Sequence, residues 1–120
     1  MPRRQPPPSP WALVAAPLAV RLAVARDPGS TSEQLVVVAP SLLEARDPSM
    51  DEIVRSVVLH ASCPGPVASR FVGHPDPVVR RAILDVPGLP ATTLDALAHD
   101  REPDIADRAR ALLAQLNDAR

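Results

Sequence analysis

The chain repeats itself. Residues 20–39 align without a gap on residues 79–98 at an offset of 59, and a third copy begins at Val54, which lies 25 positions before Val79. Helix-breaking residues recur at similar places in each copy. A period near 25 with such punctuation is typical of a stacked solenoid, in which each unit buries its apolar face only against its neighbours. The sequence therefore predicts an all-α fold built as a short α-solenoid.

The unit 76–100 shows why each copy should form two short helices. Asp76 is a good N-cap, and Pro77 suits the first helical position because its missing N–H would have been unpaired there. We expect a first helix over 77–85 with Arg80 and Arg81 on its flank, ended by Pro87-Gly88, and a second helix after Pro90. The positions spaced for burial are Val79, Ala82 and Ile83 in the first helix and Leu94, Leu97 and Ala98 in the second.

The other copies also predict short helices, but their helix starts and turns have different residues. Ser30-x-x-Glu33 and Ser49-x-x-Glu52 predict capping boxes that start helices. About nine extra residues around 41–47 form either a longer helix or a loop. Residues 62–66 differ from the Pro-Gly turn of the unit 76–100, which indicates a register slip or an irregular turn. From Pro103 onward the sequence predicts an amphipathic end helix, with apolar residues at Ile105, Ala109, Leu112, Leu113 and Leu116.

These patterns predict one domain and a separate arm. Residues 1–10 are rich in Pro and Arg and are expected to be a disordered arm, while 11–120 form a single helical-repeat domain. Its units are expected at about 17–40, 50–75 and 76–100, followed by a C-terminal cap at 101–117. Cys63 is the only cysteine, so no intrachain disulfide is expected and a cytoplasmic location is favoured. The apolar stretch before Arg21 is too short to span a membrane.

The order of a proline-punctuated turn, a Leu-x-x-Leu-Ala helix and a Pro-led helix resembles the leucine-rich repeat variant family. The resemblance is clearest over 86–100, next over 27–39 and weakest over 61–75, and it covers most of residues 19–113. It implies three to four repeats of short helix pairs, one helix often 3₁₀, wound into a right-handed superhelix close to HEAT repeats. Two residues depart from the pattern: Leu89 replaces a capping Thr, and Ser69 replaces a core Leu.

Three arginines occupy the same place in successive units: Arg21, Arg55 and Arg80. Stacking should align them in a row, with Arg81 beside it. Such a row could bind phosphates, or each guanidinium could pair with a carboxylate or a helix-end carbonyl of the adjacent unit. Thirteen Arg stand against 14 acidic residues for a net charge of −1, and aromatic residues are scarce, so internal pairing is favoured and nucleic acid is the less favoured partner.

The remaining candidate residues do not predict a catalytic or metal site. Trp11 and Phe71 are interpreted as packing residues, or as partner anchors if exposed. His74 and His99 are one repeat apart, too far to share a zinc ion, and Cys63 lacks an evident base. We therefore expect no enzyme activity, no cofactor and no metal. The predicted function is a scaffold that binds another protein on its repeat face, with a nucleic-acid-binding solenoid as the alternative and a homo-oligomer through the first unit left open.

Overall fold

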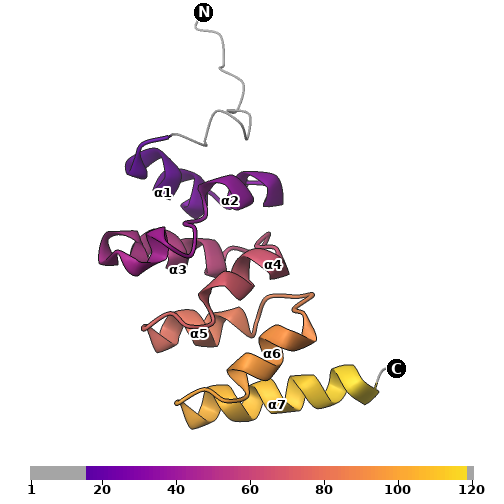
Figure 1. Ribbon diagram of the computed structural model, residues 1–120. Helices are drawn as coiled ribbons and strands as arrows, with labels where there is room; N and C mark the ends of the chain where they lie inside the picture. Colours follow the sequence, from indigo (N-terminus) through magenta and orange to yellow (C-terminus); the bar gives the residue numbers. More distant parts are fainter. Residues whose placement is uncertain (1–15, 119–120) are drawn as a thin grey trace, which may run out of the picture.

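The computed structural model describes residues 16–118, and all of its regular elements in this range are helical (Figure 1). The predicted N-terminal arm at 1–10 therefore lies outside the described residues. The elements are, in chain order, α1 (Leu18–Arg26), α2 (Ser32–Val38), the 3₁₀ turns η2 (Glu44–Arg46) and η3 (Pro48–Met50), α3 (Asp51–Leu59), α4 (Gly65–Ala68), the 3₁₀ turn η4 (Ser69–Phe71), α5 (Pro77–Ile83), α6 (Ala91–Leu97) and α7 (Pro103–Asp118). Within residues 16–118 no helix has the length and apolarity needed to cross a bilayer.

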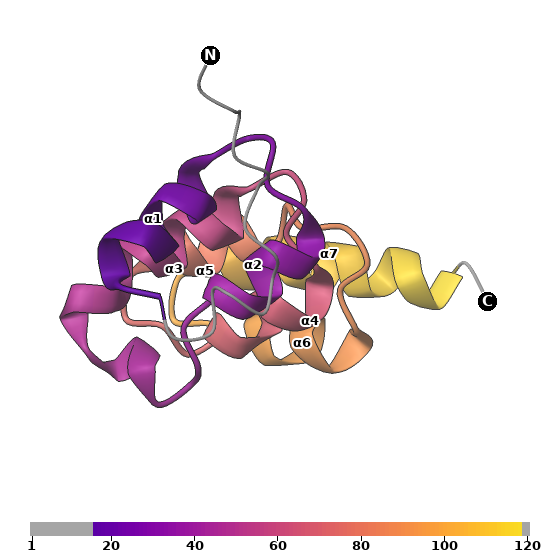
Figure 2. The ribbon, with the colours of Figure 1, turned by 90° about the horizontal axis from the view of Figure 1, so that it is seen from above.

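The helices lie in two rows. α1, α3 and α5 follow one another in the first row, where α1 contacts α3 and α3 contacts α5. α2, α4 and α6 form the second row, and α7 packs against α6 at the far end (Figures 1 and 2). The molecule measures 56 × 32 × 18 Å with a radius of gyration of 15.7 Å, whereas a compact domain of 100 residues has about 13 Å. The arrangement is elongated along the direction in which helices succeed one another.

The predicted start of the helix at Pro77 is confirmed. The Asp76 carboxylate accepts a hydrogen bond from the N–H of Val78 at 2.9 Å, and Pro77 opens α5. α5 ends at Ile83, two residues short of the predicted end at position 85. The turn that follows needs Gly88, whose φ of +74° is a conformation that L side chains rarely adopt.

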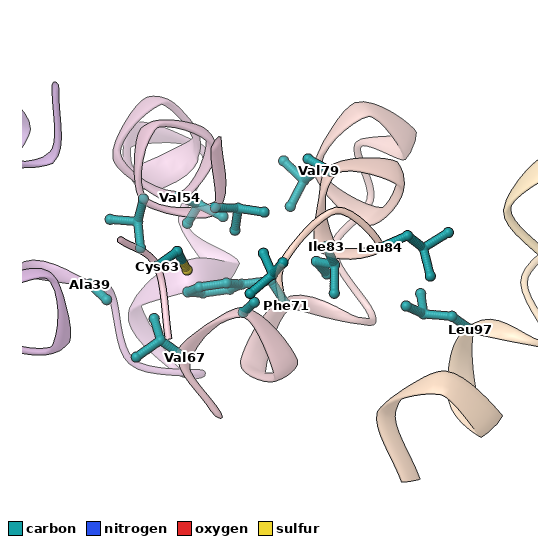
Figure 3. Close-up of a cluster of buried hydrophobic side chains, with 14 of the residues drawn as sticks. Ala39, Val54, Cys63, Val67, Phe71, Val79, Ile83, Leu84 and Leu97 are labelled. Carbon is teal, nitrogen blue, oxygen red and sulfur yellow. The ribbon is translucent and has the colours of Figure 1, made fainter. Parts of the chain in front are cut away.

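The core includes residues that the helical spacing predicts, together with residues outside that pattern such as Cys63, Val67 and Phe71. Figure 3 shows the ring of Phe71 near the middle of the cluster, with Cys63 and Val67 on one side and Ile83 on the other. Full burial of a Val, Leu, Ile or Phe side chain contributes about 1.5–3 kcal/mol. The predicted core positions that are buried are Val79, Ala82, Ile83, Leu94, Leu97, Ala98, Ile105 and Ala109, and Ile53, Val54, Val57 and Val58 are buried on one face of α3 with the same three-four spacing.

Both predicted capping boxes are wrong. Ser30 is buried and its hydroxyl donates to the carbonyl of Val24 at 2.6 Å, so α2 is capped instead by Thr31 in a reciprocal box with Gln34. Before α3, the chain already turns at Asp47, whose carboxylate accepts the N–H of Ser49 at 3.0 Å. The cap of α2 thus stands one position later than predicted, whereas α3 starts after Met50 with no side-chain cap and Asp47 caps η3 instead.

The irregular segments of the sequence become 3₁₀ turns. The extra residues around 41–47 contain η2 and lead into η3, so they neither extend α2 nor stay without structure. In the second unit the four-residue α4 passes into η4, which is the irregularity expected there. Ser69, at the position of a core Leu, donates to the carbonyl of Gly65 at 2.8 Å and accepts the hydroxyl of Thr93 at 2.7 Å. Phe71 supplies the missing apolar volume.

Helix α7 is amphipathic as predicted. Ile105, Ala106 and Ala109 are buried, and Leu112 and Leu113 pack against the core from partly buried positions. Leu116, predicted on the same apolar face, is exposed. The charged side chains of Asp107, Arg108 and Arg110 face away from the core and are exposed. α7 thus gives the C-terminal end of the described chain one apolar and one polar side.

Candidate partner-binding surface

Arg21 holds the first unit to the connection that follows it. Its guanidinium donates from Nε to the carbonyl of Val38 at 3.1 Å and from Nη1 to Oε2 of Glu44 at 2.9 Å. The side chain is buried, although its charged partner is partly exposed. The hydrogen bond from Arg21 is the main reason that the pKa of Glu44 is lowered.

Arg80 makes the most buried ion pair of the described residues. Nε donates to Oδ2 of Asp100 at 2.8 Å, and Nη1 donates to the carbonyls of His74 at 2.7 Å and Pro75 at 3.1 Å. The exposed fractions of the two side chains are 6% for Arg80 and 4% for Asp100. Burial alone would raise the pKa of Asp100, but hydrogen bonds from Arg80 and from the N–H of Glu102 outweigh it, and the pKa is lowered. Arg80 was predicted on the flank of α5, and the next connection covers it.

Arg55 makes the same kind of contact at the surface. Its Nη2 lies 2.8 Å from Oδ2 of Asp76, the N-cap of the next unit's first helix, and its side chain is 48% exposed. This hydrogen bond is the first cause of the lowered pKa of Asp76. In all three cases the repeat-equivalent arginine reaches the chain segment that leads to the following unit. The row is therefore engaged in internal pairing, and the buried Arg21 and Arg80 are closed to a phosphate backbone.

The other candidate residues from the sequence do not form a site with this row. Arg81 is exposed and pairs with Asp104 of α7, with Nε 2.7 Å from Oδ2. Phe71 is 1% exposed, so its ring is not available to a partner. Trp11 lies outside the described residues.

Two histidines hold turns together through both ring nitrogens. In His74, which is buried, Nδ1 accepts the N–H of Asp76 at 3.1 Å and Nε2 lies 3.1 Å from Oδ1 of Asp51. In His60, Nδ1 accepts the N–H of Ser62 at 3.0 Å and Nε2 lies 2.7 Å from the carbonyl of Asp27. Because Nδ1 is an acceptor in both rings, the proton is assigned to Nε2, which then donates. These contacts are structural, and residues 16–118 hold no cluster of three His, Cys, Asp or Glu able to bind a metal.

Cys63 is a packing residue in the core. It is buried, and burial raises the pKa of its thiol to about 11. A thiolate nucleophile needs the opposite shift and a nearby base. Although His60 is close in sequence, its two ring nitrogens are engaged by Ser62 and Asp27.

The arginines without a partner are a different set from the predicted one. Within residues 16–118, Arg46, Arg70 and Arg101 form neither an ion pair nor a side-chain hydrogen bond. Arg46 and Arg70 line a hollow of about 360 Å³ together with Leu42, Phe71 and Pro75. Arg101 lines a second hollow of about 190 Å³ with His99 and the Arg80–Asp100 pair. Both hollows include Val72, Gly73 and His74, so they flank one stretch of chain.

Exposed leucines adjoin the first hollow. Leu42 lines it and is 66% exposed, and its neighbour Leu43 is 74% exposed. Both belong to the extra segment between α2 and η2. A surface that joins apolar side chains with arginine has the composition of protein interfaces, in which Arg is enriched and most other charged types are depleted.

No protein-family model, no curated protein and no solved structure matches this chain. The relation to leucine-rich repeat variants and HEAT repeats therefore stays a prediction that depends on the repeat itself.

Sequence reasoning missed Arg46, Arg70 and Arg101 because it followed the arginines at the repeat position of Arg21, Arg55 and Arg80. Arg46 and Arg101 share a local signal: each stands two residues before the proline that opens the next helical segment, Pro48 or Pro103. No comparable signal marks Arg70. Its availability follows from the fact that its side chain, at the half-buried start of η4, has no acid in contact.

Proposed function

We propose that this chain is a short, right-handed α-solenoid of helical repeats, similar to leucine-rich repeat variants, that acts as a non-catalytic scaffold and binds another protein. The succession of α1, α3 and α5 in one row supports the repeat architecture. So do the contacts by which Arg21, Arg55 and Arg80 each reach the next connection. A stack fixed in this way offers a rigid surface, and a rigid surface loses little entropy when a partner docks.

The observation that carries the proposal is the pair of hollows beside the exposed leucines. We name the surface formed by Leu42, Leu43, Arg46, Arg70, Val72, Gly73, His99 and Arg101 the connection face, because it follows the chain segments that join one unit to the next. Its free guanidinium groups and apolar side chains need no internal bond to be broken before they contact a partner. The alternative of nucleic-acid binding through Arg21, Arg55, Arg80 and Arg81 loses support because all four are already paired.

Site-specific photo-crosslinking in the source cell tests this function. A benzoylphenylalanine placed at Leu42 should give a discrete protein adduct, because that side chain stands in the proposed interface. The matched control is Leu59, which is 60% exposed but lines a hollow with Arg26, Pro28 and His60 away from the connection face. Adducts at Leu42 alone support the proposal. No protein adduct at Leu42, or equal adducts at both positions, would contradict it. An adduct with the mass of a second copy of this chain identifies the partner as a homo-oligomer.

A further inference from the structure

Three connections between helical units lie one below another along the left-hand side of Figure 1. They are the segments that lead from α2 to α3, from η4 to α5 and from α6 to α7. Arg46 belongs to the first, Arg70 lies at the start of η4 just before the second, and Arg101 belongs to the third. The segments that carry or adjoin the unpaired cations therefore succeed one another along the molecule.

This surface carries a local excess of positive charge. The residues that line its two hollows include four arginines and one carboxylate, that of Asp100, and Arg80 neutralises this carboxylate. Arg46, Arg70 and Arg101 form no ion pair within residues 16–118, although the charge of Arg101 helps to lower the pKa of Asp100. The nearest acids along the chain, Asp47 and Glu102, are not among the lining residues, and the Asp47 carboxylate accepts the N–H of Ser49. The surface is thus complementary to an anionic partner.

We propose that the connection face binds an extended acidic segment of a partner protein, with carboxylates paired to Arg46, Arg70 and Arg101 and an apolar side chain on Leu42. This inference rests on the proposed function and names the chemistry of the partner. Guanidinium groups bind carboxylates through two parallel hydrogen bonds, which gives both strength and direction. Packed helices are about 8–10 Å apart and an extended chain advances about 3.3 Å per residue, so acidic residues about three apart fit successive units.

An acidic peptide fits this surface better than nucleic acid does. Single-stranded nucleic acid binds through aromatic side chains on which bases stack, and the one aromatic residue among residues 16–118, Phe71, is buried. Leu42 and Leu43, exposed at one end of the row, have no role in contacts with a phosphate backbone. An extended polypeptide supplies both carboxylates and an apolar side chain.

Fluorescence anisotropy of the full chain with a labelled synthetic peptide tests the inference. The peptide carries a leucine at one end and glutamate at every third position, with serine elsewhere; a second peptide has glutamine in place of glutamate, and a third probe is a labelled oligothymidine. The triple variant Arg46→Ala, Arg70→Ala, Arg101→Ala removes the three free cations without breaking an internal pair. The control variant Arg26→Ala, Arg81→Ala, Arg110→Ala removes the same charge from other exposed positions.

We expect the glutamate peptide to bind the wild-type chain, with affinity falling as salt rises. The triple variant should lose about tenfold or more of this affinity, while the control variant loses far less. Should the triple variant fail to fold by circular dichroism, the single Arg70→Glu variant carries the same test, because its carboxylate should repel the glutamate peptide and lower the affinity. Equal affinity for the glutamine peptide, or tighter binding of oligothymidine that depends on the same arginines, would overturn the inference.

The two proposals fail in distinguishable ways. A protein adduct at Leu42 together with no binding of the glutamate peptide leaves the scaffold function standing and removes the acidic partner. The absence of both removes both proposals.

Discussion

Replacing Arg80 by Met should strongly destabilise the fold, and replacing Arg55 by Met should not. The two residues occupy the same place in successive repeats, and each makes an ion pair with the connection to the next unit. Methionine keeps the apolar volume of the arginine stem and removes the guanidinium. Any difference between the two variants therefore reports the environment of the pair.

The burial of each ion pair sets how much unfolding free energy each variant loses. Arg80→Met leaves the Asp100 carboxylate, 4% exposed, with one remaining donor, the N–H of Glu102 at 2.9 Å, and it also removes the donor shared by the carbonyls of His74 and Pro75. Breaking a buried pair in this way costs about 3–5 kcal/mol of unfolding free energy. Arg55 is 48% exposed, and a surface pair of this kind is worth about 0.2–1 kcal/mol.

Urea unfolding followed by far-ultraviolet circular dichroism measures both values by linear extrapolation. Adding Asp100→Asn to the Arg80→Met variant should recover about 1–3 kcal/mol, because the amide is neutral and its oxygen still accepts the N–H of Glu102. A loss below about 1 kcal/mol for Arg80→Met, or equal losses for Arg80→Met and Arg55→Met, would refute the assignment of Arg80 as the buried clamp between units.

Three further perturbations test separate parts of the structure. Gly65→Ala places a Cβ 2.6 Å from the carbonyl oxygen of Gly88, so the two turns must move apart at a cost of about 1–3 kcal/mol. In the control Gly73→Ala, the added Cβ meets open space. Equal urea midpoints for the two variants would contradict this close approach. The Cys63 thiol, with its pKa raised to about 11, should react with Ellman's reagent at neutral pH only as fast as the chain unfolds, and rapid labelling of the folded protein would argue against its burial. Folding lowers the pKa values of Glu44, Asp76 and Asp100, so these groups stabilise the fold above their unfolded pKa near 4 and lose this effect as the pH falls through their lower folded pKa values. The urea midpoint should therefore hold from pH 7 to 5 and drop by pH 3. An unchanged midpoint at pH 3 would contradict the prediction.

Local signals predicted the helices well because they act within one turn. The cap at Asp76, the proline at position 77 and the three-four spacing of Val79, Ala82 and Ile83 each depend on residues a few positions apart. The prediction of the capping boxes was wrong because a capping hydroxyl can also bind a residue outside its own turn. Ser30 had the right spacing to Glu33, but its hydroxyl was already committed to the carbonyl of Val24, which lies in the preceding helix. A capping pattern does not reveal which of two adjacent hydroxyl groups the tertiary fold uses first.

The candidate site was harder to predict because the state of each arginine depends on segments far along the chain. Arg80 is buried by Asp100, 20 residues later, and Arg21 is paired by Glu44, 23 residues later. Sequence spacing placed these arginines in a row but did not show that connections of different lengths would cover two of them and leave Arg55 exposed. The free arginines become visible only when every pair has been assigned in three dimensions.

The paired and the unpaired arginines differ for a physical reason. Arg21, Arg55 and Arg80 occupy the same place in the repeat, and each pairs with a carboxylate of the chain segment that leads to the next unit, namely Glu44, Asp76 and Asp100. A residue that binds a partner must instead keep its charge free of the adjacent unit. Arg46 and Arg101 each stand two residues before the proline that opens the next helical segment, and Arg70 has no such place, but none of the three forms an ion pair within residues 16–118. Arg21, Arg55 and Arg80 therefore join successive helical segments, whereas Arg46, Arg70 and Arg101 stay available to the partner that we propose.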